Sequence, residues 1–264
     1  MATFSSRAVP PAPGESRPTA ATRPGPALLE ANLRVPARLF DVHRSHVIER
    51  LRAAQDARIV SIAAPAGYGK TTALAQLAAG LPGRVAWVTI DASDNDAVIL
   101  FAYVAAALDR VEAVPSAVFE RLGAPVAPLR DIMVELLASL AGHHDPVLLV
   151  IDDAHRLDDP AALQVLTSLV EHLPSRFRVI LAGREAPALP FARWLAEEVV
   201  LHLGPGDLAM TDDEATDVLV HRGSGLGPGQ VRQLVASLRG WPALLALAAA
   251  DGNRAEGSER PAAT

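Results

Sequence analysis

Short apolar runs alternate with longer amphipathic segments along most of this chain. Apolar runs rich in β-branched residues predict buried strands, and apolar residues at helical spacing predict helices that pack on one face. We expect five strands, at 58–64, 84–90, 147–151, 178–182 and 199–203. Helices are expected at 46–54, 70–79, 97–111, 129–141 and 160–173, with an irregular or weakly helical stretch at 112–128. The alternation predicts an α/β fold of three α/β/α layers, in which helices cover both faces of a parallel sheet.

The remaining residues divide the chain into further parts. Residues 1–32 are rich in Pro, Ala, Ser and Thr without apolar periodicity, and we expect them to be disordered. The α/β core should then span 33–205, and a small helical domain should follow at 206–250. Residues 251–264 are polar and are expected to form an unstructured tail.

Two local signals mark the helical region that follows the core. Thr211 and Glu214 have capping-box spacing, in which Thr caps the helix start and Glu reaches back to the Thr N–H. A further helix is expected at 229–238, and Gly240-Trp241-Pro242 should separate it from a short apolar helix.

Composition narrows the classes of protein that fit this pattern. Half of the 264 residues are hydrophobic, which is enough for a sizeable core, and the net charge is −6. Without a block of Lys or Arg, a broad nucleic-acid face is not expected. The absence of cysteine excludes disulfides, thiolate metal sites and cysteine nucleophiles. No apolar run reaches the roughly 18 residues that span a bilayer, so we expect a cytoplasmic protein with no membrane contact.

A glycine-rich turn lies between the first expected strand and the next helix. It fits the Walker A pattern with alanine in place of the first glycine, and its residues are Ala64, Pro65, Ala66, Gly67, Tyr68, Gly69, Lys70, Thr71 and Thr72. Gly67 and Gly69 allow a tight turn whose N–H groups approach phosphate oxygens at a helix start. Lys70 can bridge the β- and γ-phosphates, and the Thr71 hydroxyl can bind Mg²⁺. A plain turn is the alternative, but the flanking strand and helix favour a phosphate loop for ATP.

Two adjacent carboxylates end the third expected strand, about 80 residues after Lys70. This is a Walker B pattern, in which an acid at a strand end holds Mg²⁺ and a second acid polarises the attacking water. We therefore assign Asp152 to the metal and Asp153 to water activation. The alternative is that the two acids simply end a strand in a turn, and the phosphate loop favours the functional interpretation.

Two more side chains are candidates for contact with the terminal phosphate. Arg184 follows the fourth expected strand, where it can sense the γ-phosphate and stabilise its charge, and a surface arginine is the alternative. His155 either senses phosphate, orients Asp153 or is a solvent-exposed loop histidine. Arg193 and Arg239 have no comparable position, and we assign them no role.

These motifs occur in the order found in one family. The chain resembles the large ATP-binding LuxR-type (maltose-activator-like) transcriptional regulators of the STAND class of P-loop NTPases. The resemblance covers roughly residues 33–250 and is carried by 36–51, 64–72, 85–96, 148–157, 179–187, 208–215 and 240–242.

The resemblance implies an ATP/ADP switch that uses Mg²⁺ and hydrolyses ATP slowly. It also implies that 206–250 is a helical lid, that Pro242 packs near the adenine and that Arg184 senses the γ-phosphate. Family members continue into a sensor region and a C-terminal helix-turn-helix, whereas this sequence ends soon after Pro242. We therefore expect no DNA binding from this chain alone, and self-association or a partner protein with the output domain. A truncated regulator, an excised domain and a stand-alone domain all fit.

Two other functions remain open from the sequence. An active P-loop enzyme, either an oligomeric ATPase or a phosphotransferase, would need an arginine donated between subunits or a basic substrate lid. A truncated interaction protein that binds nucleotide only for stability, without DNA-binding activity, would not depend on Asp153.

Overall fold

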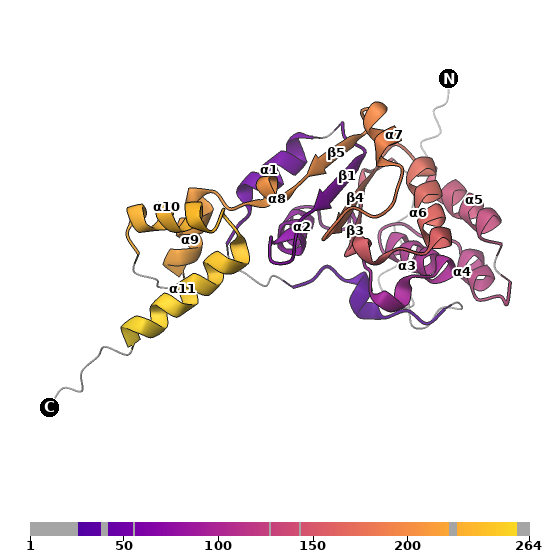
Figure 1. Cartoon of the computed structure of the whole chain (residues 1–264). Coiled ribbons are helices and arrows are strands. Elements are labelled where there is room, and N and C mark those ends of the chain that lie inside the picture. The colour runs from indigo at the N-terminus through magenta and orange to yellow at the C-terminus, as the bar shows by residue number, and fades with distance from the viewer. Residues whose placement is uncertain are drawn as a thin grey trace, which may run out of the picture.

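The computed structural model describes residues 26–37, 42–54, 56–126, 128–142, 144–221 and 226–257. A five-stranded sheet forms its centre (Figure 1). The strands are β1 (Ile59–Ala63), β2 (Val85–Thr89), β3 (Val147–Asp152), β4 (Phe177–Gly183) and β5 (Val200–Leu203). Neighbouring strands all pair in parallel, in the order β2-β3-β4-β1-β5. The five expected strands and the parallel sheet are confirmed.

Helices cover both faces of the sheet, so the three-layer α/β/α prediction is also confirmed. One face carries α1 (Ser45–Ala53) and α2 (Lys70–Ala79). The other shares its core with α3 (Ala97–Asp109), α4 (Ser116–Leu122), α5 (Leu129–Leu140), α6 (Pro160–His172) and α7 (Phe191–Ala196). Short 3-10 turns are η2 (Glu30–Leu33), η3 (Ala92–Asp94) and η4 (Ala154–Arg156).

The side chains of β3 explain why its sequence is an unbroken apolar run. Leu148 and Val150 pack into the core with α1 and α2, whereas Leu149 and Ile151 pack into the core with α3 to α6. Successive residues of a strand point to opposite faces, so a strand covered on both faces needs apolar residues at every position. The same arrangement brings the carboxyl ends of the parallel strands to one edge of the sheet.

A third, smaller hydrophobic core lies outside the sheet. It is formed by α9 (Asp212–His221), α10 (Pro228–Ser237) and α11 (Pro242–Gly257), which Figure 1 shows as a group beside the sheet. The short α8 (Pro205–Leu208) leads into them from β5. We call α8 to α11 the lid helices.

Helix α9 begins with the predicted capping box. The Glu214 N–H donates to Thr211 Oγ1 at 3.2 Å, and the Thr211 N–H donates to Glu214 Oε2 at 3.4 Å. No helix of the described ranges is both long and apolar enough to cross a bilayer.

Structure at the N-terminal side begins earlier than expected. The turn η2 is ordered because Leu33 is buried and the Leu29 N–H donates to the Tyr103 hydroxyl at 3.0 Å. The expectation of disorder up to residue 32 is therefore wrong for the described part of that segment, and residues 1–25 lie outside the described ranges.

The C-terminal boundary also differs from the expectation. Helix α11 continues to Gly257, so the prediction of an unstructured tail is wrong for 251–257, and 258–264 lie outside the described residues. The apolar start of α11 is rich in alanine, the best helix former, and no proline interrupts the chain before Pro261. Helices α7 and α8 were not expected, because a helix of one or two turns has too few residues to show periodicity.

Candidate functional site

The phosphate loop, residues 64–72, connects β1 to α2 and contains two backbone positions that need glycine. Gly67 has φ +81° and Gly69 has φ +75°, a region that other residues rarely adopt. Gly69 directly precedes α2, so the loop ends at a helix start whose free N–H groups favour an anion. The loop therefore has the conformation that the Walker A pattern predicts.

Lys70 is held inside this loop. Its ammonium donates to the backbone carbonyls of Ala64 at 2.6 Å and Pro65 at 3.1 Å, and the residue is only 8% exposed. Burial lowers the pKa of Lys70, while the charges of Asp152 and Asp153 raise it. A buried cation whose hydrogen bonds go to carbonyl oxygens gains from an anionic acceptor, and a phosphate group in the loop would provide one.

The Thr71 hydroxyl donates to Oδ2 of Asp152 at 2.7 Å. Asp152 ends β3 and is 2% exposed, and its Oδ1 accepts the N–H of Asp153 at 3.0 Å. The two side chains meet although β4 lies between β3 and β1, because α2 begins over this edge of the sheet. The structure thus brings together both residues that the sequence assigned to the metal.

This pair fits Mg²⁺ by its chemistry. A hydroxyl and a carboxylate are hard oxygen donors, and Mg²⁺ at nucleotide sites takes one or two protein ligands together with phosphate oxygens and water. The described residues contain no group of three or more His, Asp or Glu that could hold a metal ion alone. A metal held here by Thr71 and Asp152 would complete its ligands with water or phosphate oxygens.

Replacing Asp152 with asparagine should stabilise the nucleotide-free protein at neutral pH. Burial raises the pKa of Asp152, and the charge of Asp153 raises it further, so ionisation costs folding free energy as pH rises through the folded-state pKa. Asparagine keeps both hydrogen bonds because its amide can donate to Thr71 and accept from the Asp153 N–H. We expect Tm to rise by about 2–4 °C, the effect of about 1 kcal/mol in a protein of this size.

Thermal melts at pH 8 and pH 5 check this expectation. The advantage of Asp152→Asn should shrink toward pH 5, where wild-type Asp152 is more fully protonated. If Thr71 and Asp152 hold Mg²⁺ together with a nucleotide, the stability gained from Mg²⁺ should be lost in the variant. A lower Tm for the variant at pH 8 would contradict the burial argument.

Asp153 lies at the same edge, in a left-handed backbone conformation with φ 56°. Its side chain is partly exposed and faces His155 Nδ1 at 3.8 Å and Arg156 Nε at 3.7 Å. His155 is not the solvent-exposed histidine that one interpretation allowed: its side chain is 15% exposed, its Nδ1 has no hydrogen bond among the described residues, and burial lowers its pKa. Of the alternatives, orientation of Asp153 and phosphate sensing remain.

Arg184 follows β4, between the phosphate loop and the two acids. The side chain is exposed, and its charge lowers the pKa of both Lys70 and His155 by a minor contribution, which places it on this edge. A flexible cation next to the loop suits contact with a third phosphate. Arg193, in contrast, pairs with Glu171 and Glu197 on the surface.

The start of α11 lies directly on the phosphate loop. The Trp241 indole N–H donates to the Ala66 carbonyl at 3.2 Å, and its ring stacks on Tyr68 with centroids 5.8 Å apart. The Ala243 N–H donates to the Gly67 carbonyl at 3.1 Å. Pro242, expected near the adenine, is buried between these two contacts. A Cβ at Gly67 would lie 2.6 Å from that of Ala243, so this contact also requires glycine.

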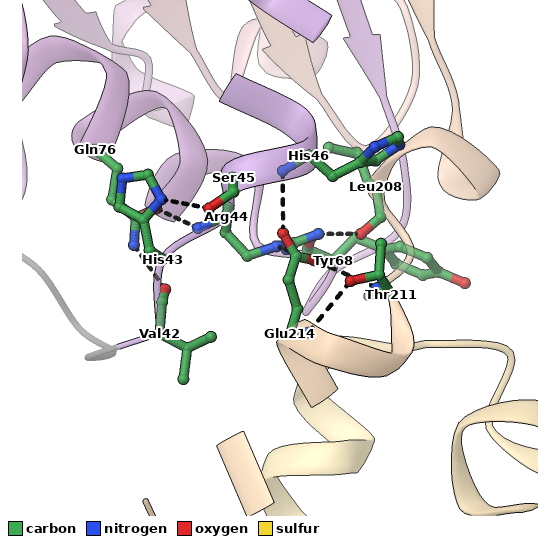
Figure 2. A network of polar contacts seen from close by, with 10 residues as sticks. All are labelled: Val42, His43, Arg44, Ser45, His46, Tyr68, Gln76, Leu208, Thr211 and Glu214. Carbon is green, nitrogen blue, oxygen red and sulfur yellow. Dashed lines mark hydrogen bonds and ion pairs between the residues drawn. The ribbon is translucent and has the colours of Figure 1, made fainter. Parts of the chain in front are cut away.

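Sequence reasoning missed Arg44, which is 2% exposed and touches both the phosphate loop and the lid helices (Figure 2). Its partners Tyr68, Leu208 and Glu214 are 24, 164 and 170 residues away in the chain. No local pattern signals such contacts, although Arg44 lies in the segment 36–51 that carries part of the resemblance.

A comparison with known protein families shows which family has this phosphate loop and these strand-end acids. The family model described as "AAA ATPase domain" matches residues 42–182, more than half of the chain. The match includes the phosphate loop and both acids and ends before Arg184 and the lid helices.

Solved structures show a similar fold. The chain resembles the Signal Transduction ATPase with Numerous Domains (STAND) protein with a tetratricopeptide repeat sensor from Pyrococcus horikoshii, with 18% identity and a TM-score of 0.54, over 80% of this chain and 30% of that one. It also resembles the Walker-type ATPase of Pyrococcus abyssi, with 12% identity and a TM-score of 0.47, over 89% of this chain and 71% of that one. At such low identity the first likeness shows the fold alone, and the chain spans less than a third of that protein's length.

Proposed function

This chain belongs to the AAA ATPase domain family, and from that membership we propose that it binds ATP and ADP with Mg²⁺ at the phosphate loop and acts as a signalling switch. The observation that carries the proposal is the hydrogen bond between Thr71 and Asp152. It joins the end of the Walker A motif to the Walker B strand beside a buried lysine, so that cation, metal ligands and anion-binding N–H groups converge on one edge of the sheet.

In this proposal each part of the site has a separate task. The N–H groups of the loop and of the first turn of α2 bind phosphate oxygens, and Lys70 exchanges its carbonyl partners for them. Thr71 and Asp152 hold Mg²⁺, which neutralises phosphate charge when bound. Trp241 and Pro242 cover the loop from the side of the lid helices and limit the access of water.

Hydrolysis in this proposal depends on Asp153 and Arg184. The partly exposed Asp153 carboxylate polarises the attacking water, with His155 beside it to fix its orientation. Arg184 stabilises charge on the terminal phosphate. Because Arg184 is exposed, it gives modest stabilisation, which supports the slow turnover of a switch rather than the fast turnover of a motor.

We also propose that the switch belongs to a LuxR-type transcriptional regulator of the STAND class. The order of the motifs in the sequence and the fold likeness to the P. horikoshii STAND protein support this placement. DNA binding and signal sensing would then lie outside the described residues, in a partner or in another part of the regulator.

Calorimetric titration with ATP and with ADP tests the proposed binding directly. With Mg²⁺ we expect saturable binding of both nucleotides at one site, and weaker ATP binding when Mg²⁺ is chelated. Absence of heat with both nucleotides at millimolar concentration, from protein with a cooperative thermal transition, would refute the proposal.

Replacing Arg184 with alanine should reduce the preference for ATP over ADP. A hydrogen bond to a charged group contributes about 1.5 kcal/mol when partly exposed, so affinity for a non-hydrolysable ATP analogue should fall about tenfold. ADP affinity should stay within about twofold of wild type, because ADP lacks the γ-phosphate that Arg184 is proposed to contact. Arg193→Ala is the control, since Arg193 is an exposed arginine with surface partners. Equal losses for both nucleotides would show that Arg184 does not read the third phosphate.

A further inference from the structure

Arg44 is a charged side chain next to the phosphate loop that is only 2% exposed, and its guanidinium has acceptors on three sides (Figure 2). Nη1 donates to the Tyr68 carbonyl at 3.2 Å, within the loop. Nη2 donates to the Leu208 carbonyl at 2.5 Å, at the end of α8. Nε donates to Oε2 of Glu214 at 3.3 Å, in the first turn of α9. One rigid group therefore contacts the loop and two of the lid helices.

Glu214 is the counterpart of Arg44 on the lid helices. Its carboxylate is also buried, and it accepts hydrogen bonds from the N–H groups of Thr211 and His46. The capping box that the sequence revealed thus has a second use, because the same side chain closes the start of α9 and neutralises Arg44. Figure 2 shows these contacts converging between the segment before α1 and the first turn of α9.

The base of Arg44 is fixed to α2. Its N–H donates to Oε1 of Gln76 at 2.8 Å, and Nε2 of Gln76 donates to the Val42 carbonyl at 2.8 Å. Because α2 begins at the phosphate loop, this attachment prevents the arginine from following the lid helices without breaking contacts. Arg44 is thus anchored on the loop side and reaches across to the other.

The loop itself presses against the guanidinium. A Cβ at Gly69 would lie 2.8 Å from Nη1 of Arg44, so the backbone at Gly69 passes directly beside the charge. A change in the backbone at Tyr68 or Gly69 moves the acceptor of Nη1 and must shift or break the other two contacts, because the guanidinium is planar and rigid.

We propose that Arg44 and Glu214 form a latch that couples the conformation of the phosphate loop to the docking of the lid helices. Arg44 is a positioning residue, which acts on the nucleotide through the Tyr68 and Gly69 backbone and not by direct contact. The coupling is reciprocal: an opened latch loosens the loop, and a rearranged loop loosens the lid helices. The expected effect on nucleotide release rests on the proposed function. The contacts that form the latch join only residues of this chain and do not depend on it.

Glu214→Gln tests the latch, because glutamine preserves the capping box and removes the charge that faces Arg44. In the described contacts Glu214 does not touch the phosphate loop, so an effect there must pass through Arg44 or through the His46 N–H at the start of α1. The variant Arg44→Lys leaves the His46 contact in place and separates these two routes. In nucleotide-free protein we expect amide hydrogen exchange to rise about tenfold in peptides covering 64–70 and 241–249 together. Release of a fluorescent ADP analogue with Mg²⁺ should accelerate by a similar factor.

Matched variants separate the latch from general destabilisation. Glu112→Gln removes the charge from another buried pair, Arg176–Glu112, which lies away from the loop and the lid helices, and it should leave exchange at both peptides unchanged. Thr211→Ala removes the cap of α9 but keeps the ion pair, and it should affect α9 without affecting 64–70. Arg44→Lys keeps the charge but cannot hold three acceptors in one plane, so it should reproduce the pattern of Glu214→Gln.

The outcomes are distinct from those that test the proposed function. If wild-type protein binds no nucleotide, the function fails while hydrogen exchange still decides the latch. If Glu214→Gln and Arg44→Lys change exchange at 64–70 no more than Glu112→Gln does, the latch is refuted, whatever the nucleotide affinity. If Glu214→Gln does not fold, hydrogen exchange at 64–70 in Arg44→Lys, compared with that in Glu112→Gln, supports or refutes the latch in the same way.

Discussion

Replacing Lys70 with alanine is expected to weaken the binding of ATP with Mg²⁺ by about 100-fold or more. Lys70 is 8% exposed and its ammonium is held at the loop by two backbone carbonyls, so it is already placed beside any phosphate that enters. Removing one partner of a buried charged contact costs about 2–5 kcal/mol, which corresponds to a factor of about 30 to several thousand in Kd. Calorimetric titration of the variant beside wild type measures the loss.

The same substitution should leave the nucleotide-free fold intact. Burial lowers the pKa of Lys70, so the charged form is held there at a cost and its removal relieves that cost. We therefore expect a Tm equal to or slightly above that of wild type. Wild-type affinity in Lys70→Ala would mean that nucleotide binds elsewhere on the chain.

Replacing Asp153 with asparagine is expected to reduce the rate of phosphate release from ATP by about 100-fold or more while nucleotide affinity stays within about threefold. General base catalysis contributes about 10²–10⁴ to such rates, and an amide cannot take a proton from water. The substitution suits this backbone, because Asp153 has φ 56° and asparagine is one of the few residues that accept this region. A phosphate-release assay with saturating ATP gives the rate.

The control for Asp153→Asn is the adjacent Asp152→Asn, which should alter the dependence on Mg²⁺. Different effects of the two neighbours would separate metal binding from water activation. An unchanged rate in Asp153→Asn would favour the alternative in which the second acid only ends β3 in a turn and the protein uses nucleotide for stability alone.

Much of the core could be predicted from the sequence because its elements are long and apolar. The β3 run is buried on both faces, and α2 begins at Lys70 as the Walker A pattern requires. The short α7 and α8 could not be predicted, since they contain too few residues to show a period. The early order at η2 depends on a hydrogen bond to Tyr103, far along the chain, which no local composition reveals.

Some contacts of the candidate site could also be predicted from the sequence, and others could not. Thr71 and Asp152 could be paired in advance, because strand ends and helix starts meet at one edge of a parallel sheet. The spatial order was not evident: β4 separates the two strands that carry the motifs. Arg44 was missed because an arginine with partners in three distant segments looks, in sequence, like any surface arginine. The resemblance pointed to Pro242, and the neighbouring Trp241 and Ala243 make the contacts with the loop.

The double constraint on Gly67 affects how related sequences should be compared. This glycine is required by its own backbone angle and also by the close approach of Ala243. A relative that has lost the ability to bind nucleotide would therefore still retain glycine at this position for as long as its C-terminal helices pack in the same way. The fold does not require lysine at position 70, because burial of its charge is unfavourable. In relatives that have lost nucleotide binding, a replaced lysine would therefore show the loss of the site, whereas a retained glycine would show only that the fold is kept.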